Sequence, residues 1–258
     1  MQPTAQSLAR TYNDRVYPDP WEKVLDYGRV LDYAAEHPND GRVRVGNALD
    51  LPNERVRGWL KDTTPDPVRA IDTAIDHGWL DPDPDSEIAA ALVELLVHVL
   101  AGGSITAQNY VPAVAPGKRV DAIEIRRSFE RVGVETKTRN ADAPGRATEI
   151  VPTFDGTVLG RCLVTMGAPT GVKTTLDRLP AVVWDVPHPV RRSFAQIYIR
   201  HRGLNYREKS TTRVQVDRPN SFIEELQDVL ADVLDERVTV SDTGITISAD
   251  AMRELGVE

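Results

Sequence analysis

Side chains that could carry out catalysis occur in this sequence without the spacing that catalysis needs. Cys162 is the one cysteine, so neither an internal disulfide nor a thiolate metal cage can form. Ser104 and Ser193 have no base beside them in a nucleophile motif. Metal-site spacing is also missing among the five histidines, His37, His77, His98, His188 and His201. Spacing alone therefore supports neither nucleophilic nor metal-based chemistry, and no catalytic residue is assigned.

A glycine-rich run at 167–174, with the order Gly-Ala-Pro-Thr-Gly-Val-Lys-Thr, invites comparison with a phosphate-binding loop. Such a loop needs its lysine directly after the second glycine and a strand before the loop. Here Val172 separates Gly171 from Lys173, and the apolar spacing before the run predicts a helix over 157–166. The run therefore does not indicate nucleotide hydrolysis, and no cofactor is expected.

Charge is segregated along the chain. The whole sequence has 31 Lys plus Arg against 39 Asp plus Glu, which gives a net charge of -8. Residues 118–218 hold 19 cations and 11 anions, a net charge of +8, while the two ends are acidic. A basic block of this kind indicates a polyanionic partner, and a solvated charged surface is the alternative.

The composition is typical of a globular cytoplasmic protein, since 41% of the residues are hydrophobic and one cysteine suits a reducing compartment. The most apolar run, 88–103, has 16 residues and includes Glu94 and His98, so it is too short and too polar to span a membrane. The opening segment has no apolar stretch typical of a secretory signal. With 25 Arg beside 6 Lys and an excess of carboxylates, the composition is similar to that of acidic, halophilic proteomes.

The elements that must position any functional side chains fall into two predicted domains, 1–80 and 87–258. The segment between them, 81–86, combines two prolines with three acids and predicts a short, stiff linker. Before the linker the apolar residues recur at helical spacing. They predict an all-helical domain with helices over 21–36, 42–49, 54–60 and 67–77.

The stretch 45–60 resembles a helix-turn-helix motif, because two short predicted helices are joined by a tight turn at 50–52. In that motif the second helix enters the major groove of DNA, so its outward polar side chains meet bases or phosphates. The resemblance assigns this role to Asn53, Arg55, Arg57 and Lys61, with Glu54 beside them and with Val56, Trp59 and Leu60 packed inward. The alternative is a small helical bundle that docks another protein.

Residues 87–258 contain one order of predicted elements twice: helix, two strands, helix, two strands, helix. The repeats span about 87–168 and 188–258. Gly103 and Gly203, which close the first helix of each repeat, are 100 positions apart. Self-similarity on this scale predicts an α+β fold in which two related halves share one core.

This second domain resembles the LAGLIDADG homing endonucleases, in the single-chain form with two repeats. The resemblance rests on the helix ends Leu-Ala-Gly-Gly-Ser-Ile at 100–105 and Ile-Arg-His-Arg-Gly at 199–203, and on the order of segments through 163–194. It implies that two signature helices pack at a pseudo-twofold axis and that two twisted sheets saddle the major groove of double-stranded DNA. It also implies that a monomer suffices, because the internal pseudosymmetry replaces a second subunit.

Alternation along the predicted strands then assigns the side chains that face DNA. They are Ser104, Thr106, Gln108, Lys137 and Arg139 in the first repeat and Arg207, Lys209, Arg213 and Gln215 in the second. Polar and apolar side chains also alternate along the exposed strands of proteins that bind no DNA. The alternative interpretation is therefore an ordinary solvent-exposed sheet.

The resemblance places a metal-binding acid just before the closing glycine of each signature helix, but these positions hold Gly102 and Arg202 here. Neither can bind Mg²⁺, and the guanidinium of Arg202 favours phosphate instead. We therefore expect a sequence-specific DNA-binding protein, a transcriptional regulator, that does not cleave its target. Two alternatives stay open: a nuclease that uses other acids such as Asp121, Glu149 or Glu208, and an RNA-processing cofactor, because basic saddles also bind structured RNA.

Overall fold

Two compact units make up the computed structural model, which describes residues 2–61, 63–205, 211–235, 238–241 and 244–257. One unit is Thr4–Asp76, and the other combines Met1–Pro3 with His77–Glu258. The segment predicted as a linker, 81–86, lies within the second unit, where the Asp81 N–H donates to the Pro3 carbonyl at 2.7 Å. Among the described residues, no helix has the length and apolar character that crossing a membrane requires.

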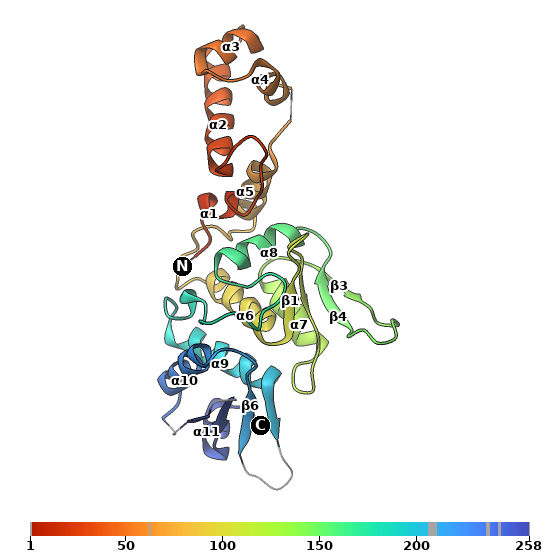
Figure 1. The fold of residues 1–258 in the computed structure, drawn as a ribbon, viewed down its shortest axis with the longest axis vertical. Coiled ribbons are helices and arrows are strands. Elements are labelled where there is room, and N and C mark those ends of the chain that lie inside the picture. Colours follow the sequence, from red (N-terminus) through yellow and green to blue (C-terminus); the bar gives the residue numbers. More distant parts are fainter. Residues whose placement is uncertain (1, 62, 206–210, 236–237, 242–243, 258) are drawn as a thin grey trace. The chain divides into compact units, whose positions relative to one another are not determined.

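The smaller unit is all-helical, as predicted (Figure 1). Its helices are α1 (Ala5–Ala9), α2 (Pro20–Glu36), α3 (Arg42–Leu49), α4 (Asn53–Trp59) and α5 (Asp66–Asp76). Helix α1 is additional to the predicted helices, because its five residues are too few to show a helical period. The core is built from the buried residues Tyr17, Val30, Val45, Val56 and Trp59.

A three-residue turn joins α3 to α4. Asp50 takes a left-handed conformation with φ 56°, and the Leu51 N–H donates to the Gly46 carbonyl at 2.9 Å. A Cβ on Gly46 would lie 2.4 Å from Asn53 Oδ1 and 2.7 Å from the Leu51 carbonyl oxygen, so only glycine fits there. The two helices and the turn expected over 45–60 are present, and their use in reading DNA stays a prediction.

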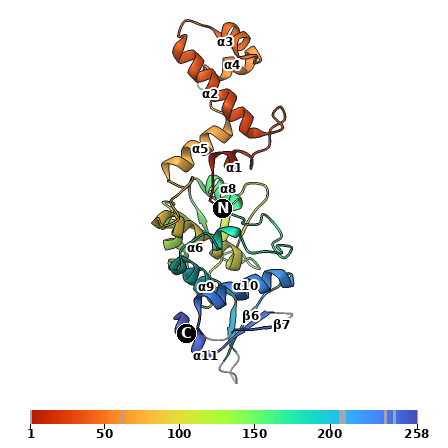
Figure 2. The same cartoon turned by 90° about the vertical axis from the view of Figure 1, so that its left-hand side faces the viewer.

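The larger unit contains one order of elements twice (Figures 1 and 2). The first half has α6 (Glu87–Gly102), β1 (Gly103–Ile105), β2 (Pro112–Val114), α7 (Ala122–Arg131), β3 (Thr136–Arg139), β4 (Glu149–Pro152) and α8 (Gly156–Thr165). The second half has α9 (His188–Arg202), β5 (Gly203–Asn205), β6 (Thr212–Gln215), α10 (Asn220–Val233), β7 (Thr239–Ser241), β8 (Gly244–Ile247) and α11 (Ala249–Leu255). A short 3₁₀ helix, Ala181–Val183, lies between the halves. The predicted α+β class and its αββαββα duplication are confirmed.

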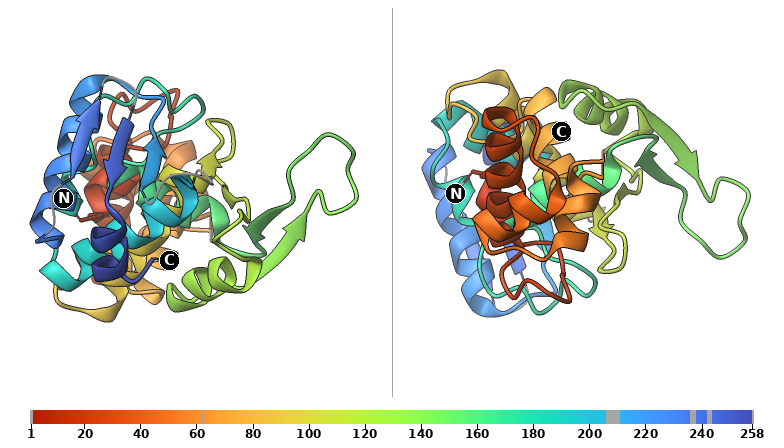
Figure 3. Two further views of the ribbon diagram at one scale, coloured as in Figure 1. Left: turned by 90° about the horizontal axis from the view of Figure 1, so that it is seen from below. Right: turned by 90° about the horizontal axis from the view of Figure 1, so that it is seen from above.

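Each half forms a four-stranded antiparallel sheet, and the two sheets have the same strand order. The order is β1-β2-β4-β3 in the first half and β5-β6-β8-β7 in the second. Helices α6 and α9 pack against one another at the centre of the unit and each runs directly into the first strand of its own sheet. The hairpin of β3 and β4 projects from the body of the unit (Figure 3). The paired helix ends are therefore the point where the two sheets begin.

The predicted strand that carries Ser104, Thr106 and Gln108 is wrong beyond Ile105. Strand β1 ends at Ile105 and β2 begins at Pro112, and a turn lies between them. Within the turn the Thr106 hydroxyl hydrogen-bonds the Asn109 side chain, and Tyr110 has φ 57°. Thr106 and Gln108 are thus exposed turn residues and do not alternate along a strand, because local side-chain bonds and the proline interrupt the pairing.

Candidate nucleic-acid interface

The ends of α6 and α9 meet through a glycine and a histidine. Helix α6 ends at Gly102, where an added Cβ would lie 2.2 Å from both Nδ1 and Cε1 of His201. The imidazole of His201 therefore occupies the space that a side chain at position 102 would need. His201 Nε2 lies 2.9 Å from His98 Nδ1, so one hydrogen bond joins the two helices at this point. The contact explains why position 102 can hold no ligating side chain unless the His201 ring is displaced.

Both histidines of this pair are neutral at neutral pH. Burial lowers the pKa of His98 to about 3, and the neighbouring His201 and Arg200 add to the shift. Burial lowers the pKa of His201 to about 4, with further repulsion from Arg202, Lys173 and Arg200. His98 is fully buried, and its Nε2 atom has no hydrogen-bond partner among the described residues. A proton on either ring would add charge to a place that is already cationic.

Lys173 caps the carboxyl end of α6. Its ammonium donates to the carbonyl oxygens of Val99 and Leu100, both at 3.2 Å, and to that of Gly103. The last carbonyls of a helix have no partner within the helix and carry partial negative charge, so an ammonium stabilises them. Burial, together with Arg202 and Arg218, lowers the pKa of Lys173 to about 8. The glycine-rich run that invited comparison with a phosphate-binding loop thus supplies a helix cap.

Arg218 brings another cation to the same place. Its guanidinium donates to the Leu100 carbonyl at 3.2 Å and to the carbonyl of Lys173, and it lies 4.8 Å from the centre of the Phe222 ring. Burial lowers the pKa of Arg218, and the charge of Arg202 acts in the same direction. Three cations therefore gather where the two helices end.

A cavity of about 270 Å³ opens beside this cation cluster, which consists of Lys173, Arg202 and Arg218. Its walls are His201, Arg202, Leu204, Gln215 and Asp217. Asp217 is the one carboxylate among these lining residues, and the part of the chain that the structure describes has no group of three or more His, Cys, Asp or Glu side chains that could hold a metal. The chemistry of the place is that of an anion site, since partly buried cations are stabilised by an anionic partner.

The outer face of the first sheet carries the predicted Lys137 and Arg139. Arg126 of α7 donates to the hydroxyls of Thr136 and Thr138, so this helix covers the threonine face of β3. Side chains alternate along a strand, and Lys137 and Arg139 therefore lie on the opposite face. Lys137 is exposed. Arg139 is half-buried and bonds the carboxylate of Glu149 on β4 at 2.9 Å, so part of its charge is compensated within the hairpin.

The second sheet presents a mostly polar outer face. Arg213 of β6 is opposite Thr246 of β8, which is opposite Thr239 of β7. Directly paired residues share a face of the sheet, so these three side chains form a row across the strands, and Gln215 continues the face along β6. Ser104 occupies the corresponding outer face of β1 in the first sheet, next to Ala113. The predicted Arg207 and Lys209, and the alternative acid Glu208, lie outside the described residues.

In the smaller unit, the structure places the predicted contact residues of α4 in two settings. Arg57 and Lys61 are exposed and, with Arg42 and Leu60, line a cavity of about 390 Å³. Asn53 is half-buried at the start of α4.

Arg55 differs from the outward placement that the motif implied, because its guanidinium donates to the Tyr17 hydroxyl at 2.8 Å and lies over the Tyr17 ring. Helix α4 thus turns Arg55 toward the body of its unit.

The two described acids proposed for alternative nuclease chemistry have structural partners. Asp121 caps α7 by accepting the Glu124 N–H at 2.8 Å. Glu149 accepts hydrogen bonds from Arg139 and from the Asn140 amide. Both carboxylates are engaged in holding local structure, which weakens the case for them as metal ligands.

Sequence reasoning missed the residues that shape the helix ends. Lys173 and Arg218 contact α6 from more than 70 positions away in the sequence, and no local sequence pattern predicts such contacts. His98 and His201 come from different repeats, so their meeting follows only once α6 and α9 are paired. The available signal was that Gly102 lacks a side chain, which leaves space for a neighbour.

Neither models of known protein families nor curated proteins match the sequence. Among solved structures, the chain is similar to the homing endonuclease I-WcaI bound to its DNA recognition sequence, with a TM-score of 0.41 and 12% sequence identity over 66% of this chain and 79% of that chain.

Proposed function

We propose that this chain is a sequence-specific double-stranded DNA-binding protein, a transcriptional regulator, that does not cleave its target. The observation that carries the proposal is the cation cluster of Lys173, Arg202 and Arg218 at the ends of α6 and α9, from which both sheets start. A resident metal would meet like charge there, whereas a phosphate would relieve the repulsion among the cations.

Two sheets that carry polar side chains extend from this centre. Their side chains, Ser104, Lys137, Arg139, Arg213 and Gln215, combine donors for phosphates with donors and acceptors for base edges. The resemblance to LAGLIDADG proteins adds an expectation of how such sheets are used, as ribbons in the major groove. The exposed Arg57 and Lys61 of the smaller unit supply a second basic surface on the same chain.

The first experiment selects bound sequences from a randomised duplex pool at high salt. Selected duplexes are then incubated with the full chain in Mg²⁺, in Mn²⁺ and in a chelator, and analysed for retention and for strand breaks. We expect sequence-dependent retention in all three conditions and intact DNA. A defined double-strand break in Mg²⁺ would favour the nuclease alternative and refute the proposal.

A competition experiment separates DNA from RNA. The selected duplex is labelled and displaced with unlabelled duplex of the same sequence, with a scrambled duplex and with a structured RNA hairpin. We expect the specific duplex to compete best. Displacement by the hairpin at lower concentration than by the specific duplex would favour the RNA-processing alternative.

A further inference from the structure

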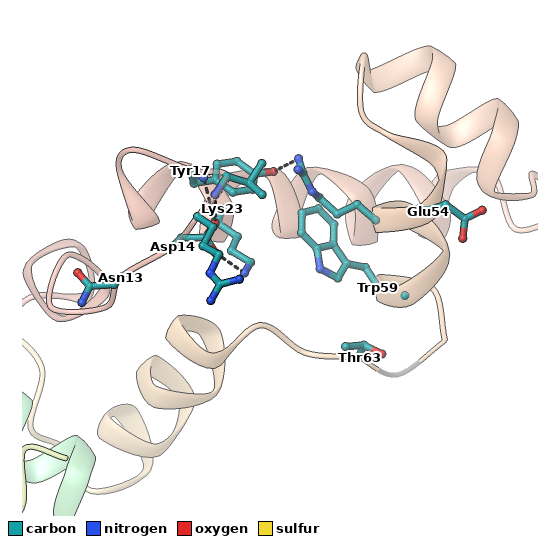
Figure 4. Close-up of a pocket in the computed structure, with 11 residues that line it drawn as sticks. Asn13, Asp14, Tyr17, Lys23, Glu54, Trp59 and Thr63 are labelled. Carbon is teal, nitrogen blue, oxygen red and sulfur yellow. Dashed lines mark hydrogen bonds and ion pairs between the residues drawn. The ribbon is translucent and has the colours of Figure 1, made fainter. Parts of the chain in front are cut away.

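A cavity in the smaller unit has the features of a small-molecule site. It measures about 530 Å³ and lies between the loop at 13–17 and helix α4 (Figure 4). Trp59 and Arg55 of α4 line one side, and Arg15 and Tyr17 of the loop line the other. Cavities of a few hundred cubic ångströms are the size that binds small ligands.

The loop that forms one wall is held in place by a dense set of hydrogen bonds. The Asp14 carboxylate accepts the N–H groups of Val16 at 2.8 Å and Tyr17 at 3.0 Å, and also the Lys23 ammonium at 2.6 Å. The Tyr17 hydroxyl donates to Asp26 at 2.8 Å. A wall fixed in this way needs little ordering when a ligand arrives.

Arg55 provides a guanidinium that pairs with no carboxylate of the described residues. Its guanidinium contacts two aromatic residues: the Tyr17 hydroxyl at 2.8 Å, the Tyr17 ring at 4.6 Å and the Trp59 ring at 6.0 Å. Arg15 likewise has no carboxylate within ion-pair distance in the described part of the chain. Two cations of the cavity are therefore available to an anion.

The carboxylates of the cavity are already engaged. Asp14 is bonded as described above, and Glu54 pairs with Arg42 at 3.2 Å and with Arg57 at 3.5 Å. Figure 4 shows the Glu54 side chain directed away from the space beside Trp59. The cavity therefore presents the guanidinium donors of Arg55 and Arg15, and the largely buried side chains of Trp59 and Tyr17 form part of its wall.

We propose that this cavity binds a small planar anion of the aromatic carboxylate class. The carboxylate bonds Arg55, with Arg15 beside it, and the flat ring packs against Trp59. A charge-assisted bond to a guanidinium gives orientation, and contact between flat rings gives affinity. A phosphodiester of DNA has no apolar body to cover the two aromatic side chains, so a discrete small molecule fits the cavity better. The proposal is independent of the DNA-binding role.

The test follows the Trp59 indole N–H signal of the full chain in nitrogen-15-edited NMR spectra, assigned with Trp59→Phe. Benzoate is titrated beside benzyl alcohol, which lacks the charge, and cyclohexanecarboxylate, which lacks the flat ring. We expect a saturable shift with benzoate and affinities about tenfold weaker or worse for both analogues, the factor that one lost charged or aromatic contact produces.

Variants identify the residues involved. Arg55→Met should weaken benzoate binding about tenfold or more, and Arg15→Gln should weaken it about threefold, since loss of a charged hydrogen bond costs more than loss of an exposed charge. Arg44→Met is the matched control, because Arg44 is exposed on α3 and pairs with Asp40 outside the cavity. We expect its affinity for benzoate to equal that of the unchanged chain.

Three results would overturn the proposal: no saturable response to benzoate, an equal response to benzyl alcohol, or a response of the Trp59 signal to duplex DNA and not to benzoate. Should Arg55→Met fail to fold, the ligand comparison and Arg15→Gln still decide the outcome, because neither disturbs the bond between Arg55 and Tyr17.

Discussion

The buried histidine pair predicts a loss of stability in mild acid that is confined to the larger unit. His98 and His201 have pKa values of about 3 and about 4 in the folded chain, against 6.5 as the ordinary value. Because both folded pKa values lie below the unfolded value, the unfolded chain binds more protons as the pH falls below 6.5. The stability of the larger unit is therefore greatest above pH 6.5, and it falls progressively as the pH drops from 6.5 toward the two folded pKa values.

The loss of unfolding free energy at pH 5 depends mainly on the pKa of the histidines in the unfolded chain. The folded rings bind almost no proton at that pH, while each unfolded ring is almost fully protonated, which costs about 2 kcal/mol per histidine relative to pH 7.5. Coupling between the two rings and the partial exposure of His201 reduce the combined cost of the two histidines to about 3 kcal/mol. Glu94 and Glu124 act in the opposite direction, because burial raises the pKa of each carboxyl and their protonation in the folded chain favours folding as the pH falls.

Cys162 provides an assay that reports on this unit alone. It is the one cysteine of the chain, it is fully buried in α8, and it becomes reactive only when the larger unit opens. Samples in a urea series at pH 7.5 and at pH 5.0 receive a short pulse of dithiodipyridine, which reacts with thiols at both pH values. We expect the free energy of unfolding to be about 3 kcal/mol lower at pH 5.0.

Two variants separate the pair from other titrating groups. His98→Gln should reduce the difference between the two pH values by about 2 kcal/mol, whatever it does to the stability itself. His37→Gln is the matched control, because His37 is exposed and belongs to the smaller unit. Equal stability of the unchanged chain at both pH values, or a loss of pH dependence in the control, would refute the reasoning.

Three further predictions concern the helix ends and α4. Gly102→Ala should destabilise the larger unit by about 1–3 kcal/mol, because the new Cβ would overlap the His201 ring, and the Cys162 assay measures this cost. Arg202→Gln should weaken binding of the selected duplex by about 1.5–3 kcal/mol and reduce by about 1 the slope of log binding constant against log salt concentration. Fluorescence polarisation at several salt concentrations measures both quantities, and unchanged values would show that Arg202 is not part of the interface. Arg57→Ala should weaken the same binding by about 1 kcal/mol or more. The melting temperature should not change, since Arg57 is exposed. Unchanged affinity would favour the alternative that the smaller unit docks another protein.

Most elements could be predicted from the sequence because their boundaries carry local signals. Helix α11 and strand β8 begin at such signals, since Ser248 caps the helix and Gly244 begins the strand. Duplication could be recognised because Gly103 and Gly203 close equivalent helices. These features depend on neighbours in the chain, which is the information that residue spacing contains.

The arrangement at the helix ends could not be predicted, because it depends on contacts between distant segments. The order of residues around Lys173 invites comparison with a nucleotide loop, and its role as a cap follows only from the position of the Leu100 carbonyl. Arg55 was placed outward by helical spacing, but the Tyr17 ring, from a loop with no predicted element, draws it inward. Long side chains have enough reach for tertiary contacts to override their position on a helix.

The meeting of Gly102 with His201 makes the two halves unequal at the place where α6 and α9 end. One helix end has a bare backbone, while the other contributes an imidazole and a guanidinium, and Lys173 caps α6 without an equivalent described at α9. Under the proposed function, even a perfectly palindromic duplex laid across the two helix ends meets different chemistry on its two arms. The larger unit thus has a head and a tail, and a sequence bound to it has a defined direction.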